Sequence, residues 1–159
     1  IRASGMAFTF LRDNFYADFM PALVREDGVI RGPAGQGRVA AVAQDDIADA
    51  ATAVLLDPAS HAGSTYSLTG PESLTLDEVA TTVTAELGRP TRYDAETLEE
   101  AYASRASYGA PSWLVDAWVS TYTSIATGEV AGVTDDVERL TGQRATSLAE
   151  LLRSGSNAY

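Results

Sequence analysis

Side chains that commonly carry enzyme chemistry are scarce in this sequence. It contains one histidine, His61, and neither cysteine nor lysine. Thiolate nucleophiles and cysteine zinc sites are therefore excluded within it, and one histidine cannot build a histidine metal site. A serine nucleophile would have only His61 as its base, and no Gly-x-Ser-x-Gly motif occurs. We expect no metal site, identify no catalytic residue, and favour a loop position for His61 over a catalytic role.

The lack of lysine also limits redox chemistry. Neither a Walker phosphate loop nor a Tyr-xxx-Lys reductase pair can exist without it. Any hydride chemistry must therefore come from a bound cofactor and not from a side-chain acid of that kind.

Two pairs of adjacent acids, Asp45 with Asp46 and Asp135 with Asp136, are the next candidates for chemistry. Adjacent side chains point in different directions along a backbone, so neither pair makes an acid and base facing one substrate. Both pairs precede helical patterns. We therefore predict that Asp45 or Asp46 caps the first helix, and that Thr134 caps the second with Asp135 and Asp136 in its first turn.

The loop GPAGQG at residues 32–37 resembles a phosphate cradle at first sight. A dinucleotide loop must open a helix whose N-terminal amides face the pyrophosphate, and this loop is followed by a strand pattern. We therefore favour a hairpin or an irregular loop between residues 28–30 and 38–43 over a phosphate site.

The stretch at residues 37–56 organises the chain. A period-two apolar run over residues 39–43 predicts a strand, and the apolar residues that follow have helical spacing: Ile47, Ala50, Ala51, Val54 and Leu55. Residues 7–11 predict an interior parallel strand because apolar side chains occupy both faces. Residues 14–24 have helical spacing that Pro21 bends or ends, and residues 65–69 predict another strand.

The second half of the chain is mainly helical by pattern. Three helix starts have the capping-box pair of a Ser or Thr followed three residues later by Glu: Thr75 with Glu78, Thr97 with Glu100, and Ser147 with Glu150. Residues 111–127 predict a helix with an apolar and aromatic stripe, read as a core face or a pocket wall. A short strand is expected at residues 91–93, and residues 154–159 are expected to fray.

Composition narrows the class of protein. The formal net charge of −11 and the scattered basic residues disfavour nucleic acid and acidic membrane surfaces as partners. No apolar run approaches the length of a membrane span, so we expect a cytoplasmic protein. The elements together predict an α/β fold: the end of a doubly wound parallel sheet over residues 1–70, followed by a small, mainly helical lobe over residues 71–155.

Four blocks of sequence carry a resemblance to a known family. They are SGMAFTFLRDNFYADF (residues 4–19), GQGRVAAVAQDDIADAATAVLLDP (35–58), HAGSTYSLTGPESLTLDEVA (61–80) and VTDDVERLTGQRATSLAELLR (133–153). In this order they resemble the NmrA-like branch of the atypical short-chain dehydrogenase/reductases, near its NAD(P)H quinone and azo reductase-like members.

The resemblance implies a Rossmann-type NAD(P) site whose glycine loop lies in an N-terminal half that this sequence does not contain. In such proteins the backbone after the first strand here lies beside the nicotinamide, and the next, aromatic segment lines the substrate pocket. The residues implied at the cofactor are Leu11, Arg12 and Asn14. Those implied at the substrate pocket or its helical lid are Asp13, Phe15, Tyr16, Phe19, Trp113 and Trp118. Relatives more usually have Asn or Pro where this chain has Asp13.

Two functions follow from the resemblance. One is the transfer of hydride from NAD(P)H to a quinone-like or azo acceptor, and the other is a non-catalytic NAD(P)-binding redox sensor that contacts another protein. Fold alone does not separate them. A helical interaction module is a third, less favoured interpretation. The implied partners are a small-molecule acceptor and, beside the strand at residues 7–11, either the missing N-terminal half or a second copy of the chain.

Overall fold

We describe the protein from a computed structural model, which describes residues 1–155. Its elements are, in chain order, η1 (Arg2–Ser4), β1 (Phe10–Asp13), η2 (Ala17–Phe19), η3 (Pro21–Leu23), β2 (Val29–Gly32), β3 (Arg38–Val39), α1 (Gln44–Leu56), β4 (Thr65–Leu68), β5 (Leu74–Thr75), α2 (Leu76–Leu87), β6 (Arg92–Ala95), α3 (Leu98–Ala106), α4 (Ser112–Ala126), α5 (Asp136–Thr141) and α6 (Leu148–Ser154). The fold class is α/β, as the sequence predicts.

The strands form three separate pairs within the described residues. β1 and β4 are parallel, with Phe10 opposite Thr65 and Asp13 opposite Leu68. β2 and β6 are also parallel, whereas β3 and β5 are antiparallel. The two strands that flank the glycine loop, β2 and β3, therefore do not pair with each other. The expected hairpin is wrong, and the irregular loop is the alternative that holds.

Two glycines of this loop allow α4 to approach closely. A Cβ atom at Gly32 would overlap the ring of Tyr122, and one at Gly37 would overlap the carbonyl oxygen of Ile125. Both neighbours belong to α4. The two glycines therefore serve backbone and ring packing.

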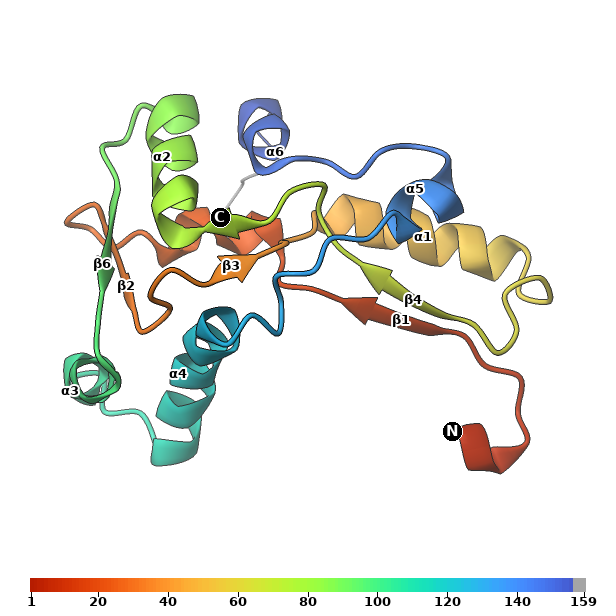
Figure 1. The fold of residues 1–159 in the computed structure, drawn as a ribbon, viewed down its shortest axis with the longest axis horizontal. Coiled ribbons are helices and arrows are strands. Elements are labelled where there is room, and N and C mark those ends of the chain that lie inside the picture. The colour runs from red at the N-terminus through yellow and green to blue at the C-terminus, as the bar shows by residue number, and fades with distance from the viewer. Residues whose placement is uncertain (156–159) are drawn as a thin grey trace.

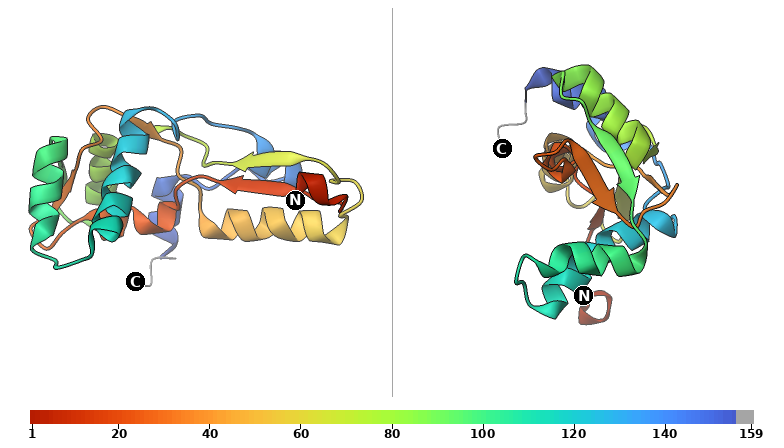
Figure 2. Two further views of the ribbon diagram at one scale, coloured as in Figure 1. Left: turned by 90° about the horizontal axis from the view of Figure 1, so that it is seen from below. Right: turned by 90° about the vertical axis from the view of Figure 1, so that its left-hand side faces the viewer.

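One end of the molecule is built from β1, β4, α1 and α5. The strands lie side by side, with α1 along one face and α5 beside it (Figure 1 and Figure 2). Buried side chains of α1, β4 and α5 form a small core with two residues of neighbouring segments, Val42 and Ala145: the three are Ala50, Leu68 and Val137. The predicted α1 stripe holds at Ala50 and Val54, but Leu55 is 76% exposed, so the stripe fails at its end.

The larger core lies at the other end, among β2, β6, α2, α4 and α6. α2 contributes the predicted face of Leu76, Val79, Ala80 and Val83, and α6 contributes its three leucines, Leu148, Leu151 and Leu152. From α4, Tyr122 and Ile125 are buried, which confirms the core interpretation of the helix predicted at residues 111–127.

Local capping signals are confirmed where both partners lie within one turn. All three predicted capping boxes are present, at the starts of α2, α3 and α6. In each, the Ser or Thr oxygen accepts from the backbone N–H three residues on, and the Glu carboxylate accepts from the N–H of the cap residue.

The predicted caps of α1 and α5 are wrong, because a distant carboxylate caps α1 and the Thr134 hydroxyl bonds elsewhere than to the start of α5. α1 begins at Gln44, after Ala43, and the Gln44 N–H donates to the Asp18 carboxylate at 2.9 Å. Asp46 instead accepts from the N–H and hydroxyl of Thr146, at 2.7 and 2.9 Å.

At α5, the residue before the helix is Asp135, without a side-chain cap bond. The Thr134 hydroxyl donates to the Ser67 carbonyl of β4 instead. The Asp136 carboxylate accepts from the Ser67 N–H at 2.8 Å, so α5 is held to β4.

The first strand and the aromatic segment differ from expectation in their bounds. β1 begins at Phe10, and the Phe8 and Phe10 rings lie 4.7 Å apart with the Arg2 guanidinium over both. The helix expected at residues 14–24 is two 3₁₀ turns, η2 and η3. Pro21 has no N–H for an α-helical bond, and the Met20 N–H donates to Ala17 in the tighter pattern.

Of the strand expected at residues 39–43, only Val39 belongs to a strand, β3, and Val42 forms an isolated parallel bridge with Tyr16. Beyond Val39, the Val42 N–H donates to the Phe15 carbonyl and the Ala17 N–H to the Val42 carbonyl, each at 2.8 Å. This segment therefore runs beside the aromatic residues that follow β1.

The division into residues 1–70 and 71–155 stays a prediction. Within residues 1–155, no helix is long and apolar enough to cross a membrane, and no group of metal-ligating side chains gathers there. Of the tail expected to fray, Ser154 still ends α6, and residues 156–159 lie outside the described residues.

Candidate functional site

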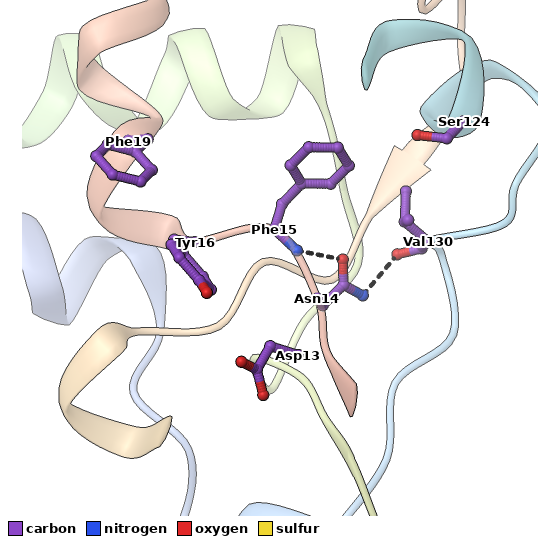
Figure 3. Close-up of a pocket in the computed structure, with 7 residues that line it drawn as sticks. All are labelled: Asp13, Asn14, Phe15, Tyr16, Phe19, Ser124 and Val130. Carbon is purple, nitrogen blue, oxygen red and sulfur yellow. Dashed lines mark hydrogen bonds between the residues drawn. The ribbon is translucent and has the colours of Figure 1, made fainter. Parts of the chain in front are cut away.

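A pocket of about 370 Å³ lies where β1 ends. The residues that line it are Asp13, Asn14, Phe15, Tyr16, Phe19, Ser124 and Val130. Figure 3 shows the three aromatic rings, with the Asp13 carboxylate and the Tyr16 hydroxyl on the same side of the chain. We call this the aromatic pocket. Its volume falls in the range of about 300–1,000 Å³ typical of small-molecule sites.

The amide of Asn14 holds two walls of the aromatic pocket together. Its Nδ2 donates to the Val130 carbonyl at 3.0 Å, and its Oδ1 accepts from the Phe15 N–H at 2.7 Å, as Figure 3 shows. The Ala40 N–H donates to the same Val130 carbonyl at 2.9 Å. The segment after α4 is thus fixed against the end of β1.

A polar groove of about 300 Å³ adjoins the aromatic pocket. It is lined by Arg12, Asp13, Asn14, Ser67, Thr69, Glu129, Val130, Gly132 and Thr134. The side chains come from the carboxyl ends of β1 and β4 and from the segment that leads into α5. Ligands of open α/β sheets bind at this end of the strands. Asp13, Asn14 and Val130 line both spaces.

A third groove, of about 440 Å³, runs along α4. It is lined by Phe15, Ser120, Thr121, Thr123, Ser124, Thr127 and Glu129. Phe15 and Ser124 also line the aromatic pocket. We call this the hydroxyl groove, and it extends the aromatic pocket along the helix.

Asp13 is the charged residue of the aromatic pocket. It stands exposed at the end of β1, yet partial burial of its carboxyl raises the pKa above its ordinary value. Burial favours the neutral form because the carboxylate loses hydration. The Tyr16 and Phe19 rings lie 5.9 Å apart at a tilt, so they form one aromatic wall.

The structure brings together most of the residues expected at the site. Asp13, Phe15, Tyr16 and Phe19 line the aromatic pocket, and Arg12 and Asn14 line the polar groove. Leu11 lines neither space and packs against the core between β1 and α1.

The two tryptophans lie apart from these spaces. Trp113 is 68% exposed in the first turn of α4, and Trp118 packs edge-on against Tyr108, with ring centroids 6.0 Å apart. Neither is among the residues that line the aromatic pocket or the two grooves. His61, as expected, lies in a turn, where its Nδ1 is 2.8 Å from the Tyr66 hydroxyl.

Some lining residues were not expected from the sequence. Ser120, Ser124 and Thr127 have the spacing of one helix face, so a polar stripe on the predicted helix was an available signal. The sequence had no signal for Val130, because Val130 binds Asn14 through its backbone carbonyl, which any residue would supply.

Comparison with curated proteins gives relatives along the whole chain, although no protein-family model matches it. The chain is 35% identical to the NAD(P)H azoreductase of Xenophilus azovorans over 162 residues, covering 100% of this chain and 56% of the azoreductase. It thus spans about half the length of the curated relatives it matches.

Solved structures agree with this similarity. The NADPH-dependent quinone oxidoreductase of Escherichia coli, complexed with NADPH, superposes with a TM-score of 0.85 at 29% identity, covering 98% of this chain and 56% of that chain. The triphenylmethane reductase of Citrobacter sp., complexed with NADP(H), gives 0.84 at 30% identity, with 97% and 55% covered. These neighbours confirm the Rossmann-type α/β fold class.

A more distant neighbour is NmrA, a negative transcriptional regulator, in complex with NAD. Its TM-score is 0.67 at 17% identity, covering 96% of this chain and 53% of that chain. At this identity the likeness shows the fold alone.

Proposed function

The chain belongs to the NmrA-like NAD(P)H reductases, and from this premise we propose that it forms the nicotinamide and acceptor side of an NAD(P)H-dependent oxidoreductase that reduces a quinone-like or azo acceptor. The observation that carries the proposal is the shared wall of the aromatic pocket and the polar groove. Asp13, Asn14 and Val130 border both spaces. A ligand in one space would therefore lie directly beside a ligand in the other, which hydride transfer requires.

The polar groove suits the nicotinamide end of the cofactor. It offers the Arg12 guanidinium and the Ser67 hydroxyl as donors to the carboxamide, ribose and phosphate oxygens, whereas the hydroxyls of Thr69 and Thr134 already donate to backbone carbonyls. Bound NAD(P)H supplies a hydride, with its electron pair, to the acceptor. We assign Arg12 and Asn14 to cofactor binding. The pyrophosphate would be held by another part of a protein whose relatives are about twice as long as this chain.

The aromatic pocket suits a flat acceptor. Phe15 and Tyr16 follow directly on the Asn14 that is fixed to Val130, and backbone bonds from Phe15 and Ala17 to Val42 hold their positions. Rings on a backbone held this way can stack on the flat face of a quinone or an azo arene. A quinone or azo acceptor also takes up a proton, which water can deliver through the open pocket.

Steady-state oxidation of NADPH by the full-length protein tests the proposal. Menadione and methyl red serve as quinone and azo acceptors, and a titration of NADPH without acceptor is run beside them. We expect turnover with at least one acceptor. Tight NADPH binding without turnover would contradict the reductase proposal and favour the sensor of the NmrA type.

A further inference from the structure

Asp13 stands on the wall that the aromatic pocket shares with the polar groove. Two carboxyl groups line the aromatic pocket and the two grooves, and they differ in place. Asp13 borders the aromatic pocket and the polar groove, whereas Glu129 borders the two grooves but not the aromatic pocket. Figure 3 shows the Asp13 carboxylate on the side of the chain where the Tyr16 hydroxyl lies. Asp13 is therefore the carboxyl group that adjoins both proposed ligands.

The carboxylate of Asp13 has no structural task among residues 1–155. It forms neither a hydrogen bond nor an ion pair with the described residues, and partial burial raises its pKa above the ordinary value. Two acids of neighbouring segments do have such tasks. Asp18 accepts from the first N–H of α1, and Asp136 accepts from a backbone N–H of β4. No bond within the fold has to break when the Asp13 carboxyl gains or loses a proton.

Other groups beside the aromatic pocket are less suited to give up a proton. The guanidinium of Arg12 stays protonated in proteins, and the phenol of Tyr16 is a weaker acid than a carboxyl group. The Ser124 hydroxyl already donates to the Thr121 carbonyl at 2.8 Å. Among the described residues that line the aromatic pocket, Asp13 is thus the strongest acid.

We propose that Asp13 is the general acid of the reductase and donates the proton that a quinone-like or azo acceptor takes up together with the hydride. The proposal rests on the proposed reductase function and deepens it. Water that enters the open pocket then returns a proton to Asp13, whose side chain is exposed at the end of β1.

Atoms and electrons balance in this step. The acceptor gains a hydride with both electrons of the nicotinamide C–H bond, and NAD(P)H is oxidised to NAD(P)⁺. Negative charge is left on an oxygen of the quinone or on the second nitrogen of the azo group. The O–H bond of the Asp13 carboxyl breaks, and its proton forms a bond to that atom. The products are a hydroquinone or a hydrazo compound and the Asp13 carboxylate, which takes its next proton from water.

The position of Asp13 on the shared wall also favours the charges that this step creates. The nicotinamide ring becomes positive in the polar groove while Asp13, which borders the same groove, becomes negative. Opposite charges that develop side by side attract each other, and such attraction lowers the barrier of a step that creates both. An acid on the opposite wall of the aromatic pocket would lack this attraction.

The first test measures acceptor reduction by variants of the full-length protein. Asp13→Asn keeps the shape of the side chain but has no acidic proton, and we expect it to lower kcat/KM for menadione about 100-fold, the low end of what a general acid contributes. The residual rate comes from water as the proton donor. Tyr16→Phe removes the competing hydroxyl and should cost much less. Glu26→Gln removes a carboxylate from an exposed turn outside these spaces and should leave kcat/KM unchanged.

Chemical rescue distinguishes proton transfer from a structural role. Asp13→Ala leaves room at an exposed position, which a small carboxylic acid from solution can enter. We expect kcat/KM of Asp13→Ala for menadione to rise in proportion to the concentration of acetic acid at constant ionic strength and pH. Wild type and Tyr16→Phe should not respond.

A binding titration without NADPH gives a readout that does not need turnover. The probe is 4-nitro-1-naphthol, a flat naphthol whose neutral and anionic forms differ in absorbance. In wild type the Asp13 carboxylate repels the anion and can accept from the hydroxyl of the neutral form. We therefore expect Asp13→Asn to lower the preference of the protein for the neutral form over the anion about fivefold. Circular dichroism checks that each variant folds.

The outcomes separate the two proposals. Turnover of menadione at an unchanged kcat/KM in Asp13→Asn overturns the role of Asp13 and leaves the reductase proposal standing. A loss in Asp13→Asn without rescue of Asp13→Ala by acetic acid, and with an unchanged naphthol titration, makes Asp13 a structural residue and also overturns its role. A larger loss in Tyr16→Phe than in Asp13→Asn assigns the proton to Tyr16 instead. Absence of turnover with every acceptor contradicts the reductase proposal itself, and the acid falls with it.

Discussion

The Asn14 side chain joins the end of β1 to Val130, across 116 positions of sequence, by a hydrogen bond of 3.0 Å. The Val130 carbonyl also accepts from the Ala40 N–H, so both of its lone pairs are used. This contact lies at the shared wall of the aromatic pocket and the polar groove. The wall between the aromatic pocket and the polar groove is therefore held by the side-chain amide of Asn14.

We predict that Asn14→Asp loosens this wall. The new carboxylate can still accept from the Phe15 N–H, but it has no donor for the Val130 carbonyl and repels it. The loss of a partly buried hydrogen bond should lower the free energy of unfolding by about 1 kcal/mol. Urea denaturation measures it, with Val130→Ala as a control that keeps the carbonyl. An Asn14→Asp variant as stable as wild type would show that the amide does not hold the wall.

Phe15 and Trp113 should differ in their effect on acceptors. Phe15→Ala removes a ring from the aromatic pocket, and we expect kcat/KM for menadione to fall about tenfold, because part of the roughly 1.5–3 kcal/mol from burying a ring is lost. The KM for NADPH should change much less. Trp113→Ala should change neither value, since Trp113 lies outside the pocket. If Phe15→Ala only lowers thermal stability, at unchanged kinetics, then Phe15 is a core residue and the pocket lies elsewhere.

Gly32 should be intolerant of a methyl group. Gly32→Ala would push a Cβ atom into the Tyr122 ring, and we expect it to lower the free energy of unfolding by about 1–3 kcal/mol, as overpacking does. Gly132→Ala is the matched control, because a Cβ atom there meets open space at an ordinary φ. Thermal melts of both variants are compared. Equal stability of the two would mean that α4 can shift away from the loop without cost.

The sequence predicts this structure well where the determinants are local. A capping box such as Thr75 with Glu78 needs only partners three residues apart, and all three boxes are present. The cap of α1 comes from Asp18 and the partner of Asp46 is Thr146, and no local pattern points to either pair. For the same reason the pairing of β2 with β6 was missed, and the sequence left a hairpin and an irregular loop as alternatives between β2 and β3.

The same difference between local and distant determinants applies to the candidate site. Residues 12–16 are consecutive in the sequence, and the resemblance to a family covers them. It could therefore place most residues of the aromatic pocket together. The opposite wall comes from Ser124 and Val130, more than 100 positions later, and only folding brings them there. The resemblance implied that Trp113 and Trp118 belong to the substrate pocket or its helical lid. In the structure, the helix that carries them faces the pocket with its serine and threonine side.

Glu96 and Arg105 should control stability at neutral pH. Arg105 is 4% exposed and donates to the Glu96 carboxylate at 2.9 Å. Burial acts to raise the pKa of Glu96, but hydrogen bonds from Arg105 and Ser104 outweigh it and hold the pKa below its ordinary value. A carboxyl with a lowered folded-state pKa stabilises the fold above its unfolded-state pKa, and this stabilisation is lost as the pH falls through the folded-state pKa.

We therefore predict that Glu96→Gln lowers the free energy of unfolding by about 3 kcal/mol at neutral pH, because it leaves the Arg105 charge buried without a counter-ion. The difference from wild type should shrink as the pH is lowered below the pKa of the unfolded carboxyl. Glu86→Gln breaks a more exposed ion pair with Arg153 and should cost no more than about 1 kcal/mol. Denaturation at several pH values measures the difference in the free energy of unfolding between wild type and Glu96→Gln. A difference that does not vary with pH would contradict the lowered pKa of Glu96 as the source of the stability.

The outer edge of β1 should be covered in the working protein. Within the described residues β1 pairs only with β4, so the backbone groups on its far side have no strand partner. Met6 before the strand and Leu55 and Leu56 at the end of α1 are exposed, the last by 81%. Unpaired strand edges and exposed apolar side chains both favour association with another chain. We expect the isolated 159-residue chain to self-associate in sedimentation velocity, and Leu55→Glu with Leu56→Glu to shift it toward monomer. In a full-length protein we expect further residues to cover this edge instead. A strictly monomeric 159-residue chain with a cooperative melt would show that β1 is stable as a free edge and needs neither the rest of the protein nor a second copy.

The isolated chain should also bind NADPH weakly in calorimetry. The reason is that the groups expected to hold the cofactor's pyrophosphate are not among its 159 residues.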